Sequence, residues 1–104
     1  MVMEQVKING FMDGAWKIAL SGDIDLGNAD AFYNVVSEAY QSQKGNIEFD
    51  CSALAFIDST TLGTFVKILK AVRLDGYTMR LVGLQAKIKK LFLICSLDSI
   101  MEIA

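Results

Sequence analysis

The sequence predicts an α/β domain in which a mixed β-sheet is flanked by α-helices. Two observations indicate this class: a hairpin pattern opens the chain, and segments of period-two hydrophobicity then alternate with segments of helical periodicity. Right-handed crossovers are expected to join the later strands. The length of 104 residues fits one domain, which we assign to residues 1–104. An apolar content of 53% predicts a thick core covered on more than one side.

The chain opens with two predicted strands, residues 5–11 and 15–20, in which apolar and polar residues alternate. Asp13 and Gly14 stand between them and predict a hairpin, because glycine accepts the positive φ that a tight turn requires. Residues 21–28 are rich in turn formers and are expected to form a loop.

Two helices with one apolar stripe each are predicted in the middle of the chain, separated by a strand at residues 46–51. Asn28 or Asp30 is expected to cap the first helix, and Gly76 is expected to end the second. The inward positions expected in the first helix are Phe32, Val35, Val36, Ala39 and Tyr40. Those expected in the second helix are Leu62, Phe65, Val66, Leu69 and Val72.

The last third of the chain predicts a strand at residues 79–82, a helix at 85–95 and an edge strand at 100–103. The lysines of this helix are expected to face solvent. Its expected inward residues are Ile88, Leu91, Phe92 and Cys95. Cys51 and Cys95 are both expected to be reduced and buried, behaving as small hydrophobes.

Composition argues against several classes of function. Histidine is absent, which removes the commonest general base and the Ser-His and Cys-His nucleophile systems. A formal net charge of −2 disfavours nucleic acid as a main partner. No apolar run approaches the ~20 residues that a membrane-spanning helix needs, and the first residues do not resemble a secretory signal. A cytoplasmic location is therefore expected.

Three acids in predicted loops, Asp23, Asp25 and Asp58, are candidates for chemistry. Two of them could act as the acid and base of a glycosidase, or bind Mg²⁺ together with nearby hydroxyls. A sheet of this size predicts no sugar-sized cleft, so solvated loop and cap residues are the favoured interpretation. No glycine-rich phosphate-binding motif follows a strand. We therefore expect no catalytic residue, no metal and no cofactor.

The segment FIDSTTLG, residues 56–63, gathers an acid and three hydroxyls at one point. In a structural interpretation, Asp58 or Ser59 caps a helix that begins near Thr60, because the free N–H groups there need acceptors. In a functional interpretation, Ser59 is modified: a phosphate at a helix N-terminus is favoured by the dipole and adds a charge of about −1.5 to −2. The residues alone favour the structural interpretation.

Three segments, LSGDIDLGNA (20–29), FIDSTTLG and KIKKLFLICSLDSIMEI (87–103), together resemble the STAS domain family of bacterial anti-sigma factor antagonists. The first is similar to the family's loop before its first helix. The second is similar to its Asp-Ser-Ser/Thr-Gly-Leu-Gly phosphorylation motif, and the third to its Val-Lys-Arg-Leu-Phe helix and the following strand. The segments occur in the family's order and cover most of the chain. The resemblance therefore implies a STAS-type sheet and favours the modified serine.

The resemblance implies that Ser59 is the phosphoacceptor, with Thr60 and Thr61 as weaker candidates. The unphosphorylated protein would bind an anti-sigma factor, a serine kinase with a histidine-kinase-like ATP-binding fold, and so free the sigma factor. Phosphorylation would end this binding, and a serine phosphatase would reset the switch. The protein itself would not be an enzyme, and it would act as a monomer or weak dimer. The implied partner-binding residues are Asp23, Asp25, Asp58, Ser59, Thr60, Thr61 and Gly63.

One departure from the motif leaves other hypotheses open. Thr61 stands where the family has glycine, and a β-branched residue there is expected to stiffen the turn and hinder a kinase. A second hypothesis is a STAS subunit of a stress-signalling scaffold or lipid-transport complex without sigma-factor regulation. A third, from a different class, is a small hydrolase or nucleotide-binding enzyme that uses Asp25, Asp58 and Ser59.

Overall fold

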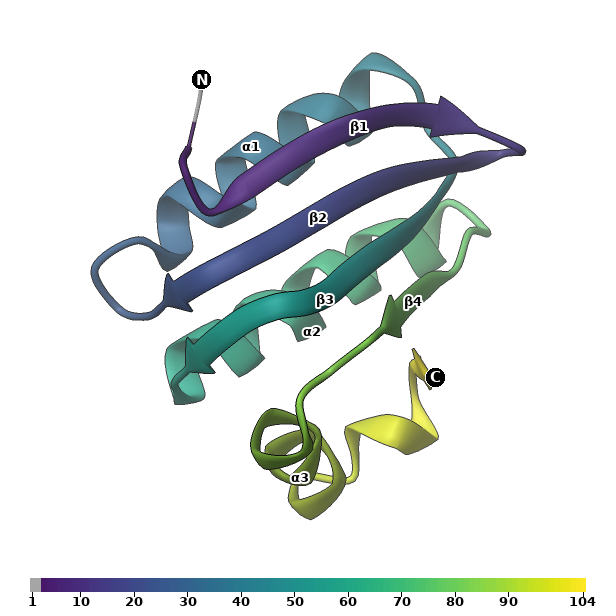
Figure 1. Ribbon diagram of the computed structural model, residues 1–104. Helices are drawn as coiled ribbons and strands as arrows, with labels where there is room; N and C mark the ends of the chain where they lie inside the picture. The colour runs from purple at the N-terminus through teal and green to yellow at the C-terminus, as the bar shows by residue number, and fades with distance from the viewer. Residues whose placement is uncertain (1–2) are drawn as a thin grey trace.

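The computed structural model describes residues 3–104 and contains one five-stranded sheet with helices α1 and α2 behind it (Figure 1). The strands lie in the order β1-β2-β3-β4-β5; β1 is antiparallel to β2, and the other neighbours are parallel. This confirms the predicted mixed α/β sheet. The elements are β1 (Val6–Met12), β2 (Ala15–Ile24), α1 (Ala29–Ser42), β3 (Asn46–Ile57), α2 (Ser59–Leu74), β4 (Met79–Val82), α3 (Ala86–Ile94), the 3₁₀ turn η1 (Leu97–Ser99) and β5 (Glu102–Ile103).

The hairpin between β1 and β2 turns at the two predicted residues. Asp13 and Gly14 both have positive φ, 55° and 79°, as a type I′ turn requires. The twist of this turn matches the twist of the two strands that it joins.

β2 and β3 are both longer than the sequence predicted. Residues 21–24 were expected to begin a loop, but they continue β2 and pair with residues 53–57 of β3. Gly22, with a φ of 66°, lies next to a register shift that lets the strand bend. The parallel neighbour satisfies the backbone groups of this segment, which outweighs the turn preferences of its residues. As a result, Ile24 and Ile57 pair at the ends of adjacent strands.

Four phenylalanines connect the three helices to the sheet. Phe32 of α1, Phe49 of β3, Phe65 of α2 and Phe92 of α3 are fully buried. Their rings meet edge to face with centroids 5.2 to 5.9 Å apart, the arrangement that ring quadrupoles favour. Cys51 lies in the same core as a free thiol, and burial raises its pKa to about 12.

The buried face of α3 is narrower than predicted. Ile88 and Phe92 are buried, but Leu91 is 37% exposed and the free thiol of Cys95 is exposed. The prediction that these two residues face inward is therefore wrong. The helix meets the core along one strip beside Phe65, so residues on either side of that strip reach solvent.

The sheet face opposite the helices carries alternating charges on four neighbouring strands. Lys17 Nζ lies 3.1 Å from Glu48 Oε2, and Arg80 Nη1 lies 3.1 Å from Glu48 Oε1. The Arg80 guanidinium also pairs with Glu102. These side chains are partly exposed, so this face of the sheet meets solvent, while α1 and α2 pack on the other face (Figure 1).

Candidate functional site

Ser59 is the first residue of α2 and is exposed, as is Thr60. β3 ends at Ile57, and Asp58 takes an extended conformation that turns the chain into the helix. The site therefore lies at the carboxyl edge of the parallel strands, where open α/β sheets usually place their binding residues. A hydroxyl at a helix N-terminus is thus presented to solvent, as predicted.

Asp58 caps α2 and links it to the loop between β2 and α1. One carboxylate oxygen accepts a hydrogen bond from the Thr61 N–H at 3.0 Å, and the other accepts one from the Leu26 N–H at 2.9 Å. These bonds hold the pKa of Asp58 below its usual value of 3.8, and the bond from Thr61 has the largest effect. Both carboxylate oxygens are engaged in positioning the backbone, so Asp58 is a cap and not a free base.

Thr61 is fully buried beneath the turn. Its hydroxyl donates to the carbonyl oxygen of Ile24 over 2.6 Å and lies 3.0 Å from Asp58 Oδ1. The expectation that Thr61 contacts a partner or accepts a phosphoryl group is wrong, because its side chain does not reach solvent. The β-branched side chain points inward and leaves the surface around Ser59 unobstructed.

The loop acids lie beside the start of α2 because β2 and β3 are adjacent and parallel. Ile24 pairs with Ile57, so Asp25 and Asp58 follow neighbouring positions. Asp23 directly precedes Ile24 near the end of β2 and is exposed. The structure thus brings the three predicted acids to one edge of the sheet.

Side chains within this loop hold its shape. Asp25 Oδ1 accepts a hydrogen bond from the Gly27 N–H at 2.9 Å. Asn28 Oδ1 accepts from the Asp25 N–H at 2.8 Å, and Asn28 Nδ2 donates to the Asp23 carbonyl at 3.0 Å. Asn28 occupies the N-cap position of α1 but makes no capping bond with its side chain, which corrects its predicted role.

Gly63 leaves a bare stretch of backbone on the exposed side of α2. It follows Ser59 by four residues, so the two share one face of the helix. A Cβ at this position would meet no atom of the described residues within 4 Å. Packing therefore does not require glycine here, although glycine costs a helix about 0.5–1 kcal/mol relative to alanine.

Two large apolar side chains at this edge were missed by the sequence analysis. Leu26 is 76% exposed, and its N–H is the group bonded to Asp58. Phe56 is 48% exposed and pairs with Asp23 across the two strands. Leu26 gave a usable signal, since an apolar residue between Asp25 and Gly27 in a tight loop cannot easily reach the core. Phe56 gave none, because β3 was predicted to end before it.

The described residues, 3–104, contain no cluster of three or more acidic, cysteine or histidine side chains able to hold a metal ion. Within the same range, no helix has both the length and the apolarity needed to span a bilayer.

Known proteins resemble this chain over most of its length. The STAS domain family model matches residues 10–104. An anti-sigma-B factor antagonist from Listeria monocytogenes serovar 1/2a is 33% identical over 87 residues, which cover 83% of this chain and 75% of the relative.

Solved structures give the same picture. A candidate anti-sigma factor antagonist from Thermotoga maritima superposes with a TM-score of 0.83 at 27% identity, covering 94% of this chain and 82% of that one. The phosphorylated form of SpoIIAA from Bacillus superposes with a TM-score of 0.75 at 19% identity, covering 95% and 90%. At that identity the SpoIIAA likeness concerns the fold, which matches the five-stranded sheet described above.

Proposed function

Because the chain belongs to the STAS domain family, we propose that it is an anti-sigma factor antagonist controlled by phosphorylation of Ser59. Its unphosphorylated form binds an anti-sigma factor that is also a serine kinase, and this binding frees the sigma factor. The name of the Listeria relative, at 33% identity, supports the antagonist role. The existence of a phosphorylated form of SpoIIAA, which shares the fold, supports the switch.

The observation that carries the proposal is the exposed Ser59 hydroxyl on a rigid cap. Asp58 fixes the start of α2 to the Leu26 backbone, so the hydroxyl is held at a defined place beside the loop. Because the hydroxyl is already held in place, less entropy is lost when a kinase aligns this acceptor with its own catalytic groups. The kinase provides the base, the nucleotide and the magnesium, and this chain provides the hydroxyl.

The surface around Ser59 suits a partner interface. The exposed side chains of Leu26 and Phe56 offer apolar contacts, and Gly63 leaves the helix backbone open to close approach. Interfaces commonly have an apolar centre and a polar rim, and Asp23 and Asp25 provide such a rim here.

Phosphorylation ends binding through charge. A phosphate on Ser59 adds about −1.5 to −2 beside the Asp58 and Asp25 carboxylates. In the free protein, water and the α2 dipole accommodate this charge. In the complex, the partner would have to displace water from the phosphate next to two acids. This desolvation costs more free energy than desolvation of the unmodified surface. A serine phosphatase then restores the binding form, and we place this cycle in the cytoplasm.

The alternative, a STAS subunit of a signalling scaffold or lipid-transport complex, depends on Thr61 replacing the motif glycine. Since Thr61 is buried and bonded beneath the turn, the replacement leaves Ser59 accessible. This geometry supports the sigma-factor pathway. Co-purification from cells with membrane transporter subunits instead of a kinase would favour the alternative.

The test begins with Ser59→Ala as bait, which should capture the kinase and retain it in the presence of ATP. Incubation of the wild type with that kinase and ATP should add about 80 Da, the mass of one phosphoryl group. Thr60→Ala is the matched control and should still gain this mass. Ser59→Asp should bind the kinase weakly. No mass change, together with wild-type binding by Ser59→Asp, would contradict the proposal.

A further inference from the structure

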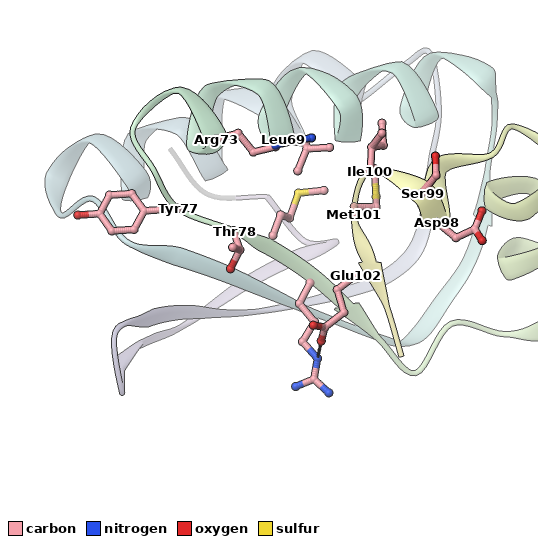
Figure 2. A pocket seen from close by; sticks show the side chains of 11 residues that line it. Leu69, Arg73, Tyr77, Thr78, Asp98, Ser99, Ile100, Met101 and Glu102 are labelled. Atoms are coloured by element: carbon pink, nitrogen blue, oxygen red, sulfur yellow. Dashed lines mark ion pairs between the residues drawn. The ribbon is translucent and has the colours of Figure 1, made fainter.

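A second site lies away from Ser59, between the carboxyl-terminal half of α2, β4 and the η1–β5 segment. It is a cavity of about 400 Å³, within the range of small-molecule sites (Figure 2). Leu69 and Arg73 come from α2 on one side, and Ile100 and Met101 come from the chain that leads into β5 on the other. We propose that this cavity binds a small amphipathic organic anion that has an apolar body and one negatively charged group.

The inner wall of the cavity is apolar. Leu69, Met79 and Met101 line it, and each is at least nine-tenths buried. Ile100, at 40% exposure, stands at the rim. Methionine side chains are flexible and polarizable, so this wall can adapt to a flat or branched hydrocarbon body.

Arg73 is the cation available to a ligand. Within residues 3–104 its guanidinium makes no ion pair or hydrogen bond. The other arginine at the cavity, Arg80, is already paired with Glu48 and Glu102. The hydroxyls of Thr78 and Ser99 donate to Asn46 and Ser96, which leaves Arg73 as the strong donor. A guanidinium fork suits a carboxylate, sulfonate or phosphate group.

The remaining charges restrict the ligand to a single anionic group. Glu102 is neutralised by Arg80, but Asp98, on the opposite side of the cavity from Arg73, has no ion-pair partner within the described chain. A second anionic group would meet this carboxylate and be repelled. A nucleoside polyphosphate therefore does not fit, whereas an aromatic or aliphatic monoanion does.

The probe is anilinonaphthalene sulfonate, with N-phenylnaphthylamine as the neutral analogue that has the same aromatic body. We expect saturable binding of the sulfonate to the folded full chain, with weaker binding of the analogue. Arg73→Gln should weaken sulfonate binding roughly tenfold, because a charge-assisted hydrogen bond is lost. The same substitution should leave the neutral analogue unchanged. Lys70→Gln removes an exposed cation of the same helix outside the cavity and is the matched control.

Two further variants test where the probes bind and how a negative charge at the cavity affects the sulfonate. Ile100→Trp should fill the cavity mouth and block both probes, while Asp98→Asn should strengthen sulfonate binding. Amide NMR shifts on titration should be confined to residues 69–80 and 98–102. No saturable binding, equal loss with Lys70→Gln and Arg73→Gln, or shifts centred on α3 would each overturn the proposal. Urea unfolding of each variant separates loss of binding from loss of fold.

Discussion

The hydroxyl of Thr61 lies 2.6 Å from the carbonyl oxygen of Ile24 and so joins the first turn of α2 to the end of β2. Asp58 adds a second link between the same two segments through the Leu26 N–H. The exposed Ser59 therefore stands on a junction fixed by side chains from one helix and backbone groups from the neighbouring connection. The position of Ser59 thus depends on hydrogen bonds made by its neighbours Asp58 and Thr61.

Replacing Thr61 with valine should destabilise the protein while preserving its shape. Valine fills the same volume, but the Ile24 carbonyl loses its donor, so the free energy of unfolding should fall by about 1–3 kcal/mol. Thr61→Ser keeps the hydroxyl and should cost less, about 0.8 kcal/mol for the lost methyl group. Urea denaturation of the two variants measures the difference. Equal stability of Thr61→Val and wild type would show that the buried bond contributes nothing.

The Asp58 cap should make stability fall in acid. Its folded pKa lies below its usual value of 3.8, so it favours folding above that pH, and this contribution is lost as pH falls through the lower, folded pKa. Asp58→Asn should therefore be less stable than wild type near neutral pH and should lose less stability near pH 3. Asp50 and Asp75 have pKa shifts of the same direction, so part of the dependence should remain.

Urea midpoints at the two pH values measure this effect. Asp98→Asn controls for removing one negative charge elsewhere on the molecule. If Asp58→Asn and wild type lost stability in parallel on acidification, the cap would not be the source of the dependence.

The sequence predicted most elements because their signals are local. Asp13 and Gly14 specify a tight turn by their own backbone preferences. The strand predicted at residues 79–82 is β4, which has the same bounds. Helix starts were also predictable, since Asp58 offers a carboxylate to free N–H groups within three residues.

Long-range contacts decided what the sequence could not show. Ser21 to Ile24 read as a loop, yet a neighbouring parallel strand extends β2 through them. Thr61 was predicted to lie at the partner surface, but its hydroxyl bonds to the backbone carbonyl of Ile24, which permits its burial. In each case a carbonyl or strand brought close by the fold changed the environment of a polar segment.

Leu26 should contribute directly to partner binding if the proposed function is right. Its side chain is 76% exposed, so Leu26→Ser should leave the free energy of unfolding nearly unchanged, and its backbone bond to Asp58 should persist. Loss of an apolar anchor at an interface should weaken binding of the anti-sigma kinase roughly tenfold or more. Calorimetry measures the affinity. Leu74→Ser, at the far end of α2 and 89% exposed, is the control and should bind like wild type.

The charged row on the open sheet face should contribute little to stability. Glu48→Gln breaks its pairs with Lys17 and Arg80, which are partly exposed. Such pairs are screened by water, so the free energy of unfolding should fall by about 0–1 kcal/mol, and less at high salt. Denaturation at two salt concentrations tests this. If the free energy of unfolding fell by several kcal/mol and by the same amount at both salt concentrations, these charged side chains would act as a buried network.

Gly63 should show opposite effects on stability and on partner binding. An added Cβ would meet no atom of residues 3–104 within 4 Å, so Gly63→Ala should raise the free energy of unfolding by about 0.5–1 kcal/mol through better helix propensity. The same methyl group would stand beside Ser59 on the exposed face and should weaken kinase binding and slow phosphorylation. Asn34→Ala, at an exposed position of α1, is the control: it should stabilise the protein similarly without affecting the partner. Unchanged binding by Gly63→Ala would mean that the partner does not approach this turn of α2, and would contradict a role of Gly63 in binding.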